Sequence, residues 1–211
     1  MKYSQEVKKH NGYSWFSDEC NIIYLGIPKT ASTSMRQLFK IDRNFMNLKN
    51  IPEGKEGYRT FTIIRNPLNR FVSGVVEAFK RSETPRKIMA IEKIGDEKKM
   101  LEAFVTILEE EFIETHTAPQ IAFFYNENGE KFSFNDVLIF ENLKEDFENM
   151  CKNFGISKEL MHRHRGEAVK QNRLRQIIND DPILLNRVNE LYKDDWVLYN
   201  EISKQKEDER K

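Results

Sequence analysis

Short, almost continuous apolar runs alternate with longer amphipathic segments along this chain. Three of these runs predict buried strands, at residues 22–26 (IIYLG), 58–65 (YRTFTIIR) and 136–140 (DVLIF). Strands that are covered on both faces lose the polar alternation of half-exposed strands, so we expect these three to lie inside a sheet. A weaker run at residues 45–48 predicts an edge strand.

Helical periodicity fills the intervals between the apolar runs. In residues 67–81 the apolar side chains recur at i, i+3, i+4 and i+7, and a proline stands at the expected first helical position. Comparable patterns predict helices over residues 33–40, 96–114, 143–154 and 181–199. Strands that alternate with helices predict a three-layer α/β/α fold around a central, mostly parallel sheet of four to five strands.

Length and composition indicate one domain. The chain has no internal repeat and no long flexible linker. Its length of 211 residues is enough to bury a substantial core. We expect a single domain over residues 1–211, with about residues 1–20 and the charged tail 203–211 peripheral or flexible.

The charge balance and the cysteines narrow the classes of function. Lysine and arginine number 34, as do aspartate and glutamate, so no global field draws the molecule to nucleic acid or to a membrane. Cys20 and Cys151 have no metal-ligand spacing, which argues against a zinc site and favours a reducing compartment. No stretch resembles a signal peptide or a membrane span. We expect a cytoplasmic protein without a membrane anchor, and the sequence does not indicate its oligomeric state.

The most informative segment follows the first predicted strand. Residues 26–34 (GIPKTASTS) place a lysine and five small residues directly before a helical pattern. Backbone N–H groups, a helix N-terminus and Lys29 would then surround an anion such as phosphate. Lys29 comes only three residues after Gly26, unlike the terminal lysine of GxxxxGK[ST], so the loop is P-loop-like but not an ordinary P-loop. No strand-end aspartate suits magnesium, so we expect anion transfer without a metal. A purely structural, capped loop is the alternative.

A second candidate for anion binding stands at the end of the strand predicted over residues 58–65. Arg65 ends this strand, where ligands gather in open α/β sheets. Ser73 follows on the helix, on the same face as Arg70 and Glu77. The rigid donor fork of arginine suits a phosphate group. A solvated helix face would account for Arg70, but less well for a strand-terminal arginine.

Together these segments resemble the sulfotransferases that use 3′-phosphoadenosine-5′-phosphosulfate (PAPS), and the carbohydrate sulfotransferases in particular. Residues 27–35 (IPKTASTSM) are similar to the family's 5′-phosphosulfate motif, and residues 63–79 (IIRNPLNRFVSGVVEAF) to its 3′-phosphate motif. Residues 116–120 (HTAPQ) and 134–147 (FNDVLIFENLKEDF) are similar to a later stretch of the family's sequences. The family's Golgi members carry an N-terminal anchor and several cysteines, whereas we expect no anchor here and this sequence has two cysteines.

The resemblance implies transfer of a sulfuryl group from PAPS to an acceptor hydroxyl, with a carbohydrate as the expected acceptor and PAP as the product. Lys29 would act on the leaving oxygen, and Arg65 and Ser73 would bind the 3′-phosphate. The 5′-phosphosulfate would be held by the small residues of the loop, which are Thr30, Ala31, Ser32, Thr33 and Ser34.

The reaction also needs a general base. His116 of HTAPQ is the first candidate, because imidazole titrates near neutral pH, where a base works best. Glu77, one turn beyond Ser73, is the rival, although either residue could be structural. In the basic stretch 162–175 (HRHRGEAVKQNRLR) we expect a mobile loop that orders on PAPS, with Arg165 in contact. A solvated surface is the alternative.

Two other functions stay open at this point. A phosphate-transferring kinase could share the architecture, but the position of Lys29 and the missing magnesium-binding aspartate disfavour it. A nucleotide-binding protein without transferase activity would follow if neither His116 nor Glu77 reaches the ligand.

Overall fold

A computed structural model describes residues 13–40, 53–80, 86–125, 130–160 and 167–210. These residues form two compact units, which we describe separately. The first, here called the sheet unit, comprises the described parts of residues 11–66, 120–163 and 198–211. The second, the helical unit, comprises the described parts of residues 67–119 and 164–197. The single domain expected from the sequence stays a prediction.

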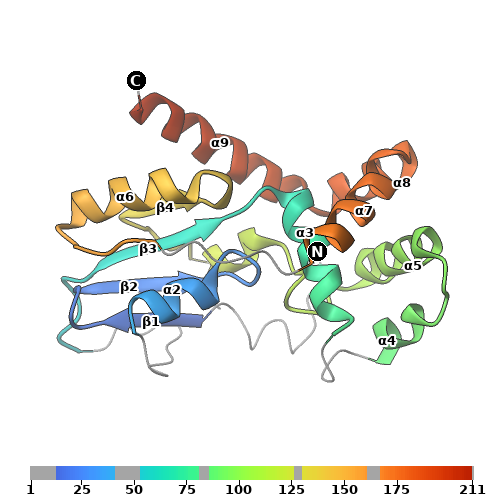
Figure 1. Cartoon of the computed structure of the whole chain (residues 1–211), viewed down its shortest axis with the longest axis horizontal. Coiled ribbons are helices and arrows are strands. Elements are labelled where there is room, and N and C mark those ends of the chain that lie inside the picture. The colour runs from blue at the N-terminus through green and yellow to red at the C-terminus, as the bar shows by residue number, and fades with distance from the viewer. Residues whose placement is uncertain (1–12, 41–52, 81–85, 126–129, 161–166, 211) are drawn as a thin grey trace. The chain divides into compact units, whose positions relative to one another are not determined.

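The described part of the sheet unit contains a four-stranded sheet in the order β1-β2-β3-β4 (Figure 1). β1 runs antiparallel to β2, whereas the pairs β2–β3 and β3–β4 are parallel. An α/β fold with a mostly parallel sheet is therefore confirmed, and the strand predicted at residues 45–48 lies outside the described residues. The strands are Tyr13–Ser17 (β1), Ile22–Gly26 (β2), Arg59–Ile64 (β3) and Asp136–Ile139 (β4).

One face of the sheet carries a row of aromatic side chains. Trp15, Tyr24 and Phe61 are neighbours on three adjacent strands, and their rings stack with centroids 5.6 Å and 4.9 Å apart. The helices α2 (Ser32–Leu38) and α6 (Leu143–Phe154) bury their apolar sides against this same face. Removing this much aromatic and aliphatic surface from water is the main stabilising contribution within the unit.

The C-terminal tail is helical rather than frayed. The helix α9 (Lys193–Glu209) contains most of the charged tail, and its part from residue 198 onward belongs to the sheet unit. Lys206 Nζ lies 2.6 Å from Asp136 Oδ1 of β4, and Arg210 Nη2 lies 2.5 Å from Asp146 Oδ1 of α6. Residues 203–209 are therefore helical, and Lys206 and Arg210 form ion pairs with partly or fully buried carboxylates, whereas the expectation of a peripheral or flexible tail stays a prediction.

The helical unit packs its helices around a separate apolar core. Its described elements are α3 (Pro67–Ala78), α4 (Arg86–Glu92), α5 (Glu97–Glu110), α7 (Ala168–Asn179), α8 (Pro182–Leu191) and the start of α9. Phe71 and Val75 of α3, Phe104 of α5 and Tyr192 are buried in this core. The helix predicted over residues 181–199 is divided at Tyr192 into α8 and α9.

The basic stretch is folded where the structure describes it. Residues 168–175, predicted as part of a mobile loop, form the first two turns of α7, because Leu174 and Ile178 of that helix are buried in the helical core. The prediction of a loop was therefore wrong for this part, while residues 161–166, including Arg165, lie outside the described residues.

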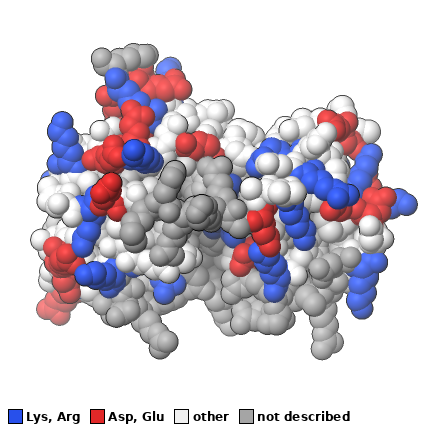
Figure 2. All heavy atoms as spheres, viewed as in Figure 1, with Lys and Arg blue, Asp and Glu red and all other residues white. Residues whose placement is uncertain are grey.

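The surface carries charges of both signs. On the face shown in Figure 2, the described lysines and arginines are interspersed with aspartates and glutamates, as the zero net charge suggests. Among the described helices, none has both the length and the apolar character needed to cross a membrane.

Candidate functional site

The loop after β2 has a strained backbone built against an aromatic ring. Gly26 is required because a Cβ atom there would lie 2.1 Å from Trp15 Cζ3. Lys29 and Ala31 have positive φ angles of 69° and 67°, which costs an L-residue about 1–2 kcal/mol. Such alternation directs successive N–H groups into one concavity, a geometry suited to anions. Strain retained in a loop of this kind points to a binding role.

The hydroxyl groups of this loop are used in different ways. Thr30 is fully buried, and its hydroxyl donates a hydrogen bond of 2.8 Å to the carbonyl of Ile27, so that group stabilises the loop itself. Residues 32–34 form the first turn of α2. Ala31 at the N-cap cannot cap this turn with its side chain, which leaves the helix N-terminus suited to a bound anion.

Arg65 contacts the same loop from the end of β3. Its guanidinium Nη1 donates a hydrogen bond of 3.2 Å to the carbonyl of Lys29, and its Cζ lies 4.4 Å from the centroid of the Phe140 ring. The structure thus brings together the two anion-binding candidates of the sheet unit. Phe140 had no role in the sequence interpretation.

Gln120 fixes the backbone of Arg65. The main-chain N–H of Arg65 donates to Gln120 Oε1 at 3.1 Å, and Gln120 Nε2 donates to the carbonyl of Arg65 at 2.7 Å. Gln120 is completely buried, so water does not compete for these two hydrogen bonds. The HTAPQ element therefore contributes to the site through its last residue, a role that the sequence interpretation did not assign.

The helical unit holds the other predicted residues. Ser73 is buried on α3, whereas Glu77 is partly exposed. Arg70 is only 1 % exposed, and its Nη1 donates to the carbonyl of Ala118 at 2.6 Å. Burial lowers the pKa of Arg70, and the charge of Asp195 opposes that shift. The solvated face expected for Arg70 was therefore wrong.

His116 lies in a short segment with many contacts. Its Nδ1 is 2.5 Å from Oε1 of Glu114, a carboxylate that is only 7 % exposed. The hydroxyl of Tyr192 donates to the carbonyl of Thr117 at 2.5 Å. The sequence interpretation missed Glu114, although the Glu-x-His spacing of residues 114–116 was the signal that could have found it.

The model of the sulfotransferase family matches residues 13–200, which include the loop after β2, Arg65 and His116. The chain belongs to the sulfotransferase family. Searches of curated proteins and of solved structures found no significant match. Family membership supports a transferase that moves a sulfuryl group, and the fold is consistent with the P-loop-like fold expected of this family.

In this sulfotransferase family member, Glu141 connects the end of β3 with α9. The main-chain N–H of Asn66 donates to both carboxylate oxygens of Glu141, at 3.2 Å and 3.1 Å, and the Tyr199 hydroxyl lies 3.3 Å from Oε2. Burial, together with the charge of Glu141 and its hydrogen bond, raises the pKa of Tyr199 to about 12.

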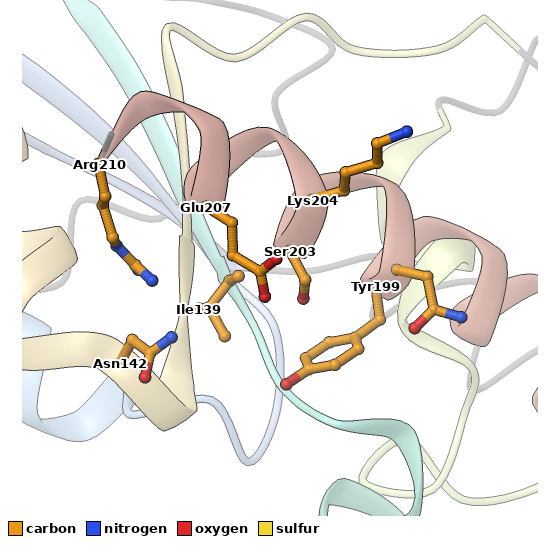
Figure 3. Close-up of a pocket in the computed structure, with 8 residues that line it drawn as sticks. Ile139, Asn142, Tyr199, Ser203, Lys204, Glu207 and Arg210 are labelled. Carbon is orange, nitrogen blue, oxygen red and sulfur yellow. The ribbon is translucent and has the colours of Figure 1, made fainter.

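A cavity of about 370 Å³ lies between α9 and the junction of β4 with α6. The side chains of Tyr199, Ser203 and Glu207 extend from α9 toward Ile139, and the guanidinium of Arg210 points toward Asn142 (Figure 3). The sequence interpretation did not identify this cavity. Among the described residues, no group of three or more His, Cys, Asp or Glu side chains is arranged to hold a metal ion.

Proposed function

We propose that this protein transfers the sulfuryl group of PAPS to a hydroxyl group of a carbohydrate. The observation that carries the proposal is the contact between Arg65 and the strained loop at Lys29, in a chain of the sulfotransferase family. Both groups stand at the carboxyl ends of neighbouring parallel strands, where open α/β sheets bind their ligands.

The donor set of the sheet unit suits an anionic nucleotide. The ammonium group of Lys29 and the N–H groups of residues 32–34 supply positive charge and hydrogen bonds for a 5′-phosphosulfate. The resemblance to the family assigns the 3′-phosphate to Arg65 and Ser73. The basic stretch 162–175 suggests Arg165 as a further contact. PAPS supplies an activated sulfuryl group and a good leaving group, the nucleotide PAP.

The chain's own residues would then stabilise the transfer. The bond from the acceptor oxygen to sulfur forms as the bond from sulfur to the bridging oxygen breaks, and PAP departs with that electron pair. Lys29 would neutralise the charge that develops on the bridging oxygen, an interaction that is stronger in the transition state than in the ground state. His116 would accept the proton of the acceptor hydroxyl, and Glu77 is the alternative base.

Two measurements test this proposal. The product nucleotide PAP is 3′,5′-ADP. At a concentration about 100 times its dissociation constant, 3′,5′-ADP should stabilise the protein by about 2.7 kcal/mol, which raises Tm by about 5–10 °C in a chain of this size. ATP should have a smaller effect. Equal shifts would favour the kinase alternative.

The second measurement is transfer of labelled sulfate from PAPS to a panel of polysaccharides, glycans, lipids and tyrosine peptides. Product on a carbohydrate supports the full proposal, and product on another hydroxyl corrects the acceptor. Strong binding of 3′,5′-ADP without any product would favour a nucleotide-binding protein that has no transferase activity.

A further inference from the structure

The backbone of the segment that contains His116 is fixed from three sides within the helical unit. Buried Arg70 donates to the carbonyl of Ala118 at 2.6 Å, and Tyr192 donates to the carbonyl of Thr117 at 2.5 Å. Helix α3 approaches so closely at Gly74 that a Cβ atom there would lie 2.4 Å from the carbonyl oxygen of His116. The position of the histidine main chain is therefore determined by packing as well as by hydrogen bonds.

The carboxylate of Glu114 fixes the remaining freedom, the orientation of the imidazole ring. Oε1 pairs with His116 Nδ1 at 2.5 Å, and Oε2 accepts a hydrogen bond of 3.1 Å from the N–H of Thr117. The main-chain carbonyl of Glu114 accepts from the hydroxyl of Thr117 at 3.1 Å. Both carboxylate oxygens are thus engaged, and the side chain is only 7 % exposed.

We infer that Glu114 is a positioning residue, which selects the tautomer of His116 in which Nδ1 carries the proton and Nε2 carries the lone pair. An ionised carboxylate can only accept hydrogen bonds, so a nitrogen that pairs with it must be the donor. The N–H of Thr117 donates to the second oxygen, so the carboxylate acts as an acceptor on both sides. This inference rests on the proposed role of His116 as the general base.

The consequence for the reaction is specific. Nε2 takes the proton from the acceptor hydroxyl while that oxygen forms its bond to sulfur, and the imidazole becomes an imidazolium. The positive charge then lies against the negative charge of Glu114 in a largely buried pair, where electrostatic interactions are stronger than in water. Glu114 acts only through His116 and does not itself contact the substrates.

Replacing Glu114 by glutamine tests the tautomer directly. In Glu114→Gln an amide NH₂ at the Oε2 position would place a donor against the N–H of Thr117. The amide oxygen therefore takes that position, and the amide NH₂ faces His116. Nδ1 must then accept, and the proton moves to Nε2. A base in this tautomer cannot take a proton, and the equivalent exchange in a hydrolase triad lowers kcat by about 10⁴-fold.

The first experiment is ¹⁵N NMR of the imidazole rings in histidine-labelled protein at about pH 8.5, above the ordinary titration range of imidazole. The chain has four histidines, and His116→Gln identifies the signal of interest by its loss. We expect a protonated Nδ1 in the wild type and a proton on Nε2 in Glu114→Gln. A wild-type ring with its proton on Nε2 and a bare Nδ1 would overturn the inference, and this result needs no variant of Glu114 that folds.

The second experiment compares the kinetics of Glu114→Gln with those of Glu111→Gln, a matched change at an exposed residue three positions earlier. We expect kcat to fall by about 10²- to 10⁴-fold in Glu114→Gln, with an unchanged dissociation constant for 3′,5′-ADP, and no change in the control. Full kcat in Glu114→Gln would overturn the inference. A wild-type protein that transfers no sulfuryl group would refute the proposed function instead, and the NMR result would still decide the tautomer.

Discussion

Replacing Gln120 by alanine should damage both the stability of the sheet unit and its affinity for nucleotide. The side chain is fully buried and makes two hydrogen bonds, of 3.1 Å and 2.7 Å, with the main chain of Arg65. The variant removes the hydrogen-bonding partner of both the N–H and the carbonyl of Arg65, and it leaves a small void. Because a buried polar group that loses its partner costs about 1–3 kcal/mol, and Arg65 is partly accessible to water, we expect a total loss of about 2–4 kcal/mol.

Urea denaturation and a thermal melt measure this loss, and titration calorimetry with 3′,5′-ADP measures the binding. For a chain of this length the expected loss lowers Tm by about 4–16 °C. Affinity should fall as well, because the strand end that carries the Arg65 guanidinium is no longer fixed. The control is Gln176→Ala, at an exposed position of α7, which should stay within about 0.5 kcal/mol of the wild type. Unchanged stability and affinity in Gln120→Ala would refute the reasoning.

Three further predictions concern catalysis and pH. In Lys29→Ala, kcat should fall far more than affinity for 3′,5′-ADP, because its proposed interaction strengthens in the transition state; full activity in steady-state assays would remove it from the mechanism. His116→Ala should abolish transfer while nucleotide binding is retained, and if Glu77→Ala does so instead, Glu77 is the base. Because the pKa of Tyr199 is raised from 10.0 to about 12, its contribution to stability is present below about pH 10 and is lost as the pH rises toward 12. Urea titrations over that range should show a shallower loss in Tyr199→Phe, and an identical slope would contradict the stated environment of the phenol.

The central strands could be predicted because their short, mostly apolar sequences are typical of buried strands. Residues 22–26 are apolar at four of five positions and are buried throughout, and residues 59–64 end in a fully buried run. β1 was missed because YSWFS is short and mixes serine with aromatic residues, which suits an antiparallel edge strand but is a weak signal by itself. Trp15 in this strand is buried only because α2 and β2 adjoin it.

The misjudged residues are those whose surroundings come from distant parts of the chain. Arg70 is polar and periodic with Ser73, which suggested a solvated face. Its partner is a carbonyl 48 residues later. The tail after residue 203 has the composition of a frayed end, yet Lys206 pairs with a carboxylate 70 residues earlier. Local pattern contains no information about partners so far away.

The residues of the candidate site also form two groups, those that a local motif predicts and those that only contacts in the folded chain reveal. The loop at Lys29 and the strand-end Arg65 were identified from short motifs at strand-to-helix junctions, because ligand binding at such junctions follows from the fold itself. Gln120 could not be assigned, since it contacts a residue whose exact approach only the folded chain determines. Glu114 had only its Glu-x-His spacing as a local signal, and its contact with the ring appears only in the folded chain. Candidate ligand-binding groups can thus be proposed from local motifs more readily than the groups that contact and position them.

The most direct test of the central claim is the difference in affinity between 3′,5′-ADP and 5′-AMP, measured by titration calorimetry on the wild type and on Arg65→Ala. Charge-assisted hydrogen bonds to the extra phosphate are worth about 1.5–3 kcal/mol, so the wild type should bind 3′,5′-ADP at least about tenfold more tightly. Arg65→Ala should lose most of that preference. Equal affinity of the wild type for the two nucleotides, or a preference that survives in Arg65→Ala, would contradict the account.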